Sequence, residues 1–175
     1  MNASACALTG HRPNRFHFGY DENHKDCLKL KMVLREQIEK LVAKGVTTFY
    51  SGLALGMDTW AASTILDIKK CNPSINLHAA IPFKAQANSW SIEQQELYHE
   101  LLAQCDNAVV MSEKYTRACY FVRNRYMVDN SKYLLAVYDG GKKGGTAYTT
   151  KYGQAQKREL IIIHPDTLAI TEILS

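Results

Sequence analysis

The apolar positions of the chain fall into short runs separated by longer stretches with helical spacing. Several runs are rich in Val, Ile, Tyr or Phe and are apolar on both faces, which is typical of strands buried between layers of helices. On this basis we predict β-strands at residues 3–8, 47–51, 75–81, 108–111, 133–138 and 160–163.

Amphipathic patterns fill the stretches between the predicted strands. In the first of them, Leu28, Leu34, Ile38 and Leu41 form one apolar stripe. We predict helices at residues 24–44, 56–70, 92–104, 120–130 and 146–157. Residues 164–175 show neither pattern, so we expect them to form a short irregular tail that could include a terminal turn.

Strand and helix alternate almost strictly, which indicates right-handed βαβ crossovers, because parallel strands cannot be joined by a tight turn. The predicted fold class is α/β, a Rossmann-like, doubly wound, mostly parallel sheet with helices on both faces. The chain has 175 residues, 46% of them hydrophobic, and no internal repeat or Pro/Gly/Ser-rich linker. We therefore expect a single domain over residues 1–175.

Composition and charge narrow the classes of partner. No apolar run reaches about 18 residues, and residues 1–10 lack a signal-peptide pattern, so we expect a cytoplasmic protein without a membrane partner. Five widely spaced cysteines are expected to be reduced and structural. The net charge of +4 is scattered, which suits an anionic ligand without requiring nucleic acid. The six histidines show no ligand spacing, so no metal site is predicted.

Ligands of open α/β sheets bind beyond the carboxyl ends of the strands, so residues that follow each strand are the candidates. After the first strand, Gly10 would let backbone amides approach an anion, and Arg12 would offer a fork of donors to a phosphate. An ordinary loop with solvated arginines is the alternative for this segment.

The second strand leads through Ser51, Gly52 and Gly56 directly into a helix. Two glycines at such a turn can expose amides to a phosphate, assisted by the positive end of the helix. Asp58 lies in the first helical turn, where it could cap the helix or bond a ribose hydroxyl. The loop matches neither the Walker pattern nor Gly-x-Gly-x-x-Gly.

The third strand is followed by Pro82, Gln86 and Trp90. Trp90 could pack between helices or form an aromatic wall for a base. All three are candidate binding residues.

Arg123 and Asn124 follow the fourth strand, at the start of a predicted helix, and are expected to point into the cleft. Asp129 is a further candidate, although an Arg125–Asp129 salt bridge at a spacing of four would explain part of this set structurally.

The fifth strand ends in a second glycine-rich stretch, in which Gly144, Gly145 and Thr146 open the next helix. This stretch is a second candidate anion cradle, with a flexible turn that binds nothing as its alternative. Two such loops at two strand ends of one sheet favour a binding site.

These segments together resemble the YpsA-like family of the SLOG superfamily, which also includes the DNA-processing protein DprA and the Lonely-guy phosphoribohydrolases. The resemblance covers nearly the whole chain and rests on five ordered motifs. They are Thr9-Gly10-His11-Arg12, Ser51-Gly52-x-x-x-Gly56-x-Asp58, Pro82-Phe83-x-x-Gln86, Arg123-Asn124-x-Tyr126-Met127-Val128-Asp129 and Gly144-Gly145-Thr146. The resemblance implies a Rossmann-like fold that binds a nucleotide or nucleotide-derived ligand such as ADP-ribose, NAD or a nucleoside phosphate, with no required cofactor.

Catalysis is not carried over with the motifs. Lonely-guy enzymes cleave an N-glycosidic bond with a glutamate three residues after the loop threonine, where this chain has Thr149. A threonine cannot serve as that carboxylate. Binding is therefore the preferred function, and an N-glycosidase that uses Asp58, Asp129 or Glu96 instead is the first alternative.

Single-stranded DNA binding of the DprA type is the second alternative. It would use a basic surface interleaved with tyrosines. The basic residues concerned are Arg12, Arg15, Lys142, Lys143 and Lys151. A homo-oligomer stays open too, since Leu97, Leu101 and Leu102 could pack on the sheet or on another subunit.

Overall fold

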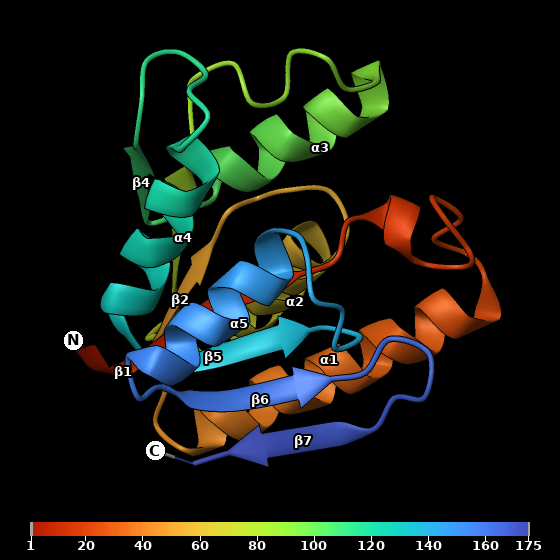
Figure 1. The fold of residues 1–175 in the computed structure, drawn as a ribbon, viewed down its shortest axis with the longest axis vertical. Helices are drawn as coiled ribbons and strands as arrows, with labels where there is room; N and C mark the ends of the chain where they lie inside the picture. Colours follow the sequence, from red (N-terminus) through yellow and green to blue (C-terminus); the bar gives the residue numbers. More distant parts are fainter. Residues whose placement is uncertain (1, 175) are drawn as a thin grey trace.

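The computed structural model describes residues 2–174, which form one seven-stranded sheet flanked by helices (Figure 1). The strand order is β4-β3-β2-β1-β5-β6-β7. The strands are β1 (Asn2–Gly10), β2 (Thr48–Ser51), β3 (Asn76–Ile81), β4 (Asn107–Val110), β5 (Ser131–Val137), β6 (Glu159–Ile163) and β7 (Ile170–Ile173). All neighbouring pairs are parallel except β6 with β7.

Five α-helices cover the sheet, and their positions agree with the predicted ones to within one or two residues. They are α1 (Lys25–Ala43), α2 (Met57–Cys71), α3 (Ile92–Ala103), α4 (Cys119–Asp129) and α5 (Gly145–Ala155), with a short 3-10 helix, η1 (Pro13–Arg15). In Figure 1, α4 and α5 lie on the near face of the sheet and α1 lies behind it. The predicted doubly wound α/β fold is confirmed.

The side chains of β1 alternate between two hydrophobic cores, as expected for a strand covered on both faces. Cys6 and Leu8 belong to the larger core with α1, α2 and α3. Ala5 and Ala7 belong to the smaller core with α4. Residues 5–9 of this central strand are thus buried.

The apolar face of α3 packs on this protein's own core. Leu101 is buried in the larger core, and Leu97 and Leu102 pack against it. This observation favours the sheet-packing interpretation of these leucines over a subunit contact.

The expectation of an irregular tail is wrong for residues 170–173. They form β7, which pairs antiparallel with β6 from Ile163↔Ile170 to Leu160↔Ile173. Leu168 takes a positive φ of 58° in the turn between the strands, a conformation that its residue type did not signal. Within residues 2–174, no helix has both the length and the apolar character needed to cross a bilayer.

Candidate functional site

A cavity of about 400 Å³ opens at the carboxyl end of β1, between the first turns of α2, α4 and α5. We call it the pocket. Eight of the predicted binding residues line it: Gly10, Arg12, Asp58, Arg123, Asn124, Gly144, Gly145 and Thr146. These residues come from four separate segments, so the parallel topology brings them together as the strand-end argument predicts.

Arg123 is the central charged group of the pocket. Its side chain is buried, with a residue exposure of 6%, and the Nε and Nη1 atoms have no hydrogen-bond partner among residues 2–174. Nη1 lies 3.6 Å from Asp58 Oδ2, which is an ion-pair distance and too long for a good hydrogen bond. Burial lowers the pKa of the guanidinium, opposed by the charge of Asp58. A buried cation with unused donors is costly unless an anion supplies the acceptors.

Asp58 partly balances this charge. Burial raises the pKa of its carboxyl group, opposed by Arg123, by the backbone amides of Ala54 and Gly52, and by Arg12. The amides that bind Asp58 thus belong to the loop before α2. The carboxylate bonds this loop and faces Arg123 rather than capping α2, whereas the ribose contact considered from sequence stays a prediction.

The 51–58 loop packs against the pocket residue Arg123. A Cβ atom on Gly52 would lie 1.1 Å from Arg123 Nη1, so only glycine leaves room for the guanidinium. Gly56 has a φ of +94°, and a Cβ there would lie 2.9 Å from the His11 carbonyl oxygen. Ser51 Oγ donates to the Asp58 carbonyl and accepts from the Leu53 amide. None of Ser51, Gly52 and Gly56 lines the pocket.

The 139–146 loop, in contrast, presents backbone directly to the pocket. Gly144, the N-cap of α5, has a φ of +105°, and a Cβ added there would meet no heavy atom within 4 Å. No side chain caps the helix, and Gly145 and Thr146 follow in its first turn. The free amides and positive end of α5 therefore face the pocket, which is the geometry that the predicted anion cradle requires.

Thr149 stabilises this helix start. Its hydroxyl group donates to the Gly145 carbonyl at 2.8 Å and accepts from Asn124 Nδ2 at 2.7 Å. The residue is fully buried. Thr149 thus joins α5 to α4, and Asp58 supplies the one carboxyl group among the pocket-lining residues of the described chain.

More cations surround the mouth of the pocket. Arg12, Arg117 and Lys143 line it, and in residues 2–174 no carboxylate lies within 4.0 Å of their charged nitrogens. Arg15 is different, because its Nη2 atom binds Asp139 at 2.7 Å. Tyr120 lies beneath this group, with the Arg12 guanidinium 5.5 Å from its ring centre. The uncompensated charge at the mouth is positive.

Asp139 also binds His11 Nε2, at 2.9 Å. Partial burial raises the pKa of Asp139, but the Gly141 amide, Arg15 and His11 together hold it well below its usual range. Asp139 therefore stays ionised and fixes the start of the 139–146 loop.

Four remaining candidates lie outside the pocket lining. Gln86 Nε2 donates to the Gly52 carbonyl at 3.1 Å. Pro82 is buried and directly follows the last residue of β3. Trp90 packs edge-on against Tyr98, with 5.5 Å between ring centres, which is the helix-packing role. Asp129 accepts a hydrogen bond from Tyr152 Oη at 2.9 Å, and the Arg125 side chain binds Tyr148 in place of the considered Arg125–Asp129 pair.

Sequence reasoning missed several lining residues at the start of α4 and on the loops. They are Asn14, Arg117, Tyr120 and Phe121. Arg117 and Tyr120 immediately flank the N-terminus of α4, which points at the pocket. A basic and an aromatic residue beside a predicted helix start were the available signal.

Comparison with known proteins places this geometry in a family. The family model YpsA, described as the YspA SLOG family, matches residues 6–168. UPF0398 protein BH1768 of Halalkalibacterium halodurans is 27% identical over 154 residues, covering 87% of this chain and 81% of the relative. A UPF0398 protein of Bacillus thuringiensis (strain Al Hakam) is 30% identical over 145 residues, covering 81% and 78%.

Three solved structures share the fold at lower identity. DprA of Streptococcus pneumoniae superposes with a TM-score of 0.57 and 17% identity over 93% of this chain, which spans 50% of that DprA chain. DprA of Helicobacter pylori, described with its single-stranded DNA binding mode, gives 0.55 and 20%, covering 90% of this chain and 64% of its own. TM1055 gives 0.59 and 13%, covering 93% and 75%. The family model covers nearly the whole chain and these neighbours share its sheet, so the chain belongs to the YpsA family of the SLOG superfamily.

Proposed function

We propose that the protein binds a nucleotide or nucleotide-derived ligand, of the ADP-ribose, NAD or nucleoside phosphate class, in the pocket. The observation that carries this proposal is the buried Arg123 side chain, whose Nε and Nη1 donors lack partners. A phosphate oxygen is a suitable acceptor for a guanidinium fork.

The surroundings of Arg123 suit a phosphate group. The uncapped N-terminus of α5 reaches the same cavity as Arg123, so one phosphate can accept from both the helix amides and the guanidinium. Arg12 and Lys143 would bind a second phosphate at the mouth. The rings of Tyr120 and Phe121 give the pocket an aromatic wall against which a base or ribose can pack.

Thermal-shift titration tests this function, because a ligand that binds only the folded state raises its stability. The ligands are ATP, NAD, ADP-ribose and nucleoside monophosphates. We expect at least one of them to raise the Tm of the wild type. The shift should vanish in Arg123→Met and shrink in Lys143→Ala, but persist in Lys142→Ala, which changes an exposed neighbour outside the pocket.

Arg123→Met leaves Asp58 without its partner and is expected to lower the starting Tm. Each variant is therefore compared with its own ligand-free sample, and calorimetric titration with the best ligand gives the affinity directly. Absence of a shift with every ligand in the wild type would contradict the proposal.

Single-stranded DNA binding is the second candidate, favoured by the exposed, unpaired Arg12, Arg117 and Lys143 around one mouth and by the shared fold with DprA. An electrophoretic shift of oligo-dT that weakens steeply between 50 and 200 mM salt would support it, as expected when several phosphates are neutralised. No shift at low salt would exclude it. An N-glycosidase would release free base in a chromatographic assay, and Asp58→Asn should abolish that release.

A further inference from the structure

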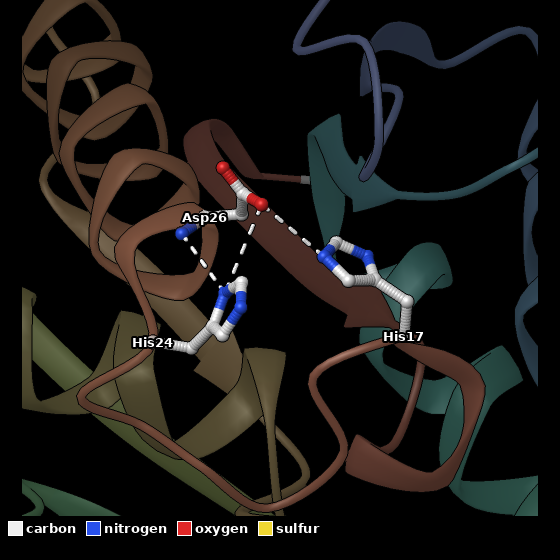
Figure 2. Close-up of side chains that lie close together, drawn as sticks. All are labelled: His17, His24 and Asp26. Atoms are coloured by element: carbon white, nitrogen blue, oxygen red, sulfur yellow. Dashed lines mark hydrogen bonds and ion pairs between the residues drawn. The ribbon is translucent and has the colours of Figure 1, made fainter.

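A second cluster of chemically active side chains lies away from the pocket, where the loop after η1 meets the start of α1. His17, His24 and Asp26 point toward one another there (Figure 2). One ligand-type atom of each residue lies within 4.8 Å of the corresponding atoms of the other two. Sequence spacing did not predict a metal site, because His17 and His24 are seven positions apart in a loop without a regular period.

Two of the three distances between the ligand-type atoms are close to those of a four-coordinate zinc site. Asp26 Oδ2 lies 3.2 Å from His17 Nε2 and 3.7 Å from His24 Nδ1. Ligand atoms about 2.0–2.1 Å from a tetrahedral zinc ion are about 3.3 Å apart. Small side-chain rotations would therefore bring all three atoms to one ion.

Two hydrogen-bond acceptors face each other in this cluster. His24 Nδ1 accepts the Asp26 backbone amide at 3.2 Å, so it carries no proton of its own. It nevertheless lies near the Asp26 carboxylate oxygen, another acceptor. Lys29 interacts with the other oxygen, Oδ1, at 3.6 Å and leaves Oδ2 to the two imidazoles. A cation bound to His24 Nδ1 would take the single lone pair that now accepts the Asp26 amide, and it would separate the two facing acceptors.

Residues around the cluster hold both imidazole rings in place. The His24 ring stacks on the buried Phe18 ring, with 5.8 Å between centres and an angle of 19°. The second nitrogen of His17, Nδ1, lies 3.6 Å from Asp166 Oδ1. This is an ion-pair distance, too long for a good hydrogen bond. A small movement would let Asp166 receive the Nδ1–H, as carboxylates do for ligating histidines at zinc sites, and would leave Nε2 free to bind.

We propose that His17 Nε2, His24 Nδ1 and Asp26 Oδ2 bind a divalent transition-metal ion of the Zn²⁺ class, with Asp166 as a positioning residue for His17. Two imidazoles and one carboxylate favour Zn²⁺ over Mg²⁺ or Ca²⁺, which prefer all-oxygen ligands. Three protein ligands leave a fourth position for water or a small anion. The ion would join the 16–24 loop to the first turn of α1, and Asp166 would connect the turn between β6 and β7 to His17.

Calorimetric titration of the chelator-treated protein with ZnCl₂ tests the site. We expect one Zn²⁺ per chain in the wild type, and affinity at least tenfold weaker in His17→Ala and in His24→Ser. The serine can still cap α1 through its hydroxyl group, so the second variant removes the ligand while keeping the cap. Asp166→Asn should weaken binding about tenfold, as changes to such supporting carboxylates do.

Two control variants remove other metal-binding side chains. His99→Ala changes an exposed histidine on α3, and Cys71→Ser removes the exposed thiol; both should bind Zn²⁺ as the wild type does. Co²⁺ bound at the site should show weak visible bands without the near-ultraviolet band of a thiolate ligand. Arg123→Met, which disables the pocket, should bind Zn²⁺ normally. No Zn²⁺ binding by the wild type, or equal binding by His17→Ala and His24→Ser, would overturn the proposal.

Discussion

The 51–58 and 139–146 loops both contain glycines and follow strands of the same sheet, yet their glycines serve different purposes. In the 51–58 loop, a side chain on Gly52 or Gly56 would collide with Arg123 or with the His11 carbonyl. In the 139–146 loop, a Cβ on Gly140 or Gly144 would meet nothing within 4 Å. The first loop uses glycine to make room inside the protein, and the second uses it to expose a helix terminus to the pocket.

Gly52→Ala should have the largest effect, because its Cβ would occupy the place of Arg123 Nη1. We expect a loss of about 2–3 kcal/mol in the free energy of unfolding, as for other overpacked cores. Loss of the guanidinium contacts should weaken ligand binding about 100-fold. Urea unfolding and calorimetric titration measure the two effects. Binding of wild-type strength in this variant would show that Arg123 is not the anion-binding group.

Gly144→Ala should separate the cost of the backbone conformation from the cost of steric contact. The φ of +105° is costly for alanine, about 1–3 kcal/mol, although the added atom meets no neighbour. The distorted α5 start should weaken ligand binding about tenfold. Gly145→Ala is the matched control: its Cβ would lie an ordinary 3.9 Å from Asn124 Nδ2 and its φ is not positive, so stability should be unchanged or slightly higher.

Asp139→Asn should loosen the start of the 139–146 loop in a pH-dependent way. The folded-state pKa of Asp139 is depressed, so its stabilising contribution is present above the unfolded value of about 3.9 and is lost as the pH falls through the folded value. We expect the variant to be about 1–2 kcal/mol less stable at pH 7. Urea unfolding from pH 7 to pH 3 should show this difference shrinking below about pH 4. A difference independent of pH would assign it to altered packing.

Thr149→Val should have the smallest effect, about 1 kcal/mol or slightly more. It removes the hydrogen bonds to Gly145 and Asn124 from a buried site while keeping the shape of the side chain. Amide hydrogen exchange should speed up in the first turn of α5 and stay unchanged in the 51–58 loop. Equal acceleration in both loops would mean that the loops are not independent.

Sequence patterns predicted the parallel sheet and its helices because buried strands and amphipathic stripes are local signals. They also identified both glycine loops and Arg123. They could not tell which loop faces the pocket. The contact between the Arg123 side chain and Gly52 depends on how α4 packs against the end of β2, which local patterns do not show. The strand β7 was missed because its residues 170–173 are short and largely exposed, with no apolar run. The cluster of His17, His24 and Asp26 was not predicted because an irregular loop brings these residues together, and such a loop has no periodic sequence pattern.

The central position of β1 has a consequence for synthesis of the protein. This first strand pairs with β5, which is made some 120 residues later, and the pocket needs both the end of β1 and the start of α5. A growing chain therefore exposes an unpaired edge of β1 until residue 137 has emerged, and the pocket is incomplete before residue 146. Contacts so distant in sequence slow folding. The pocket is therefore completed late in the synthesis of this domain.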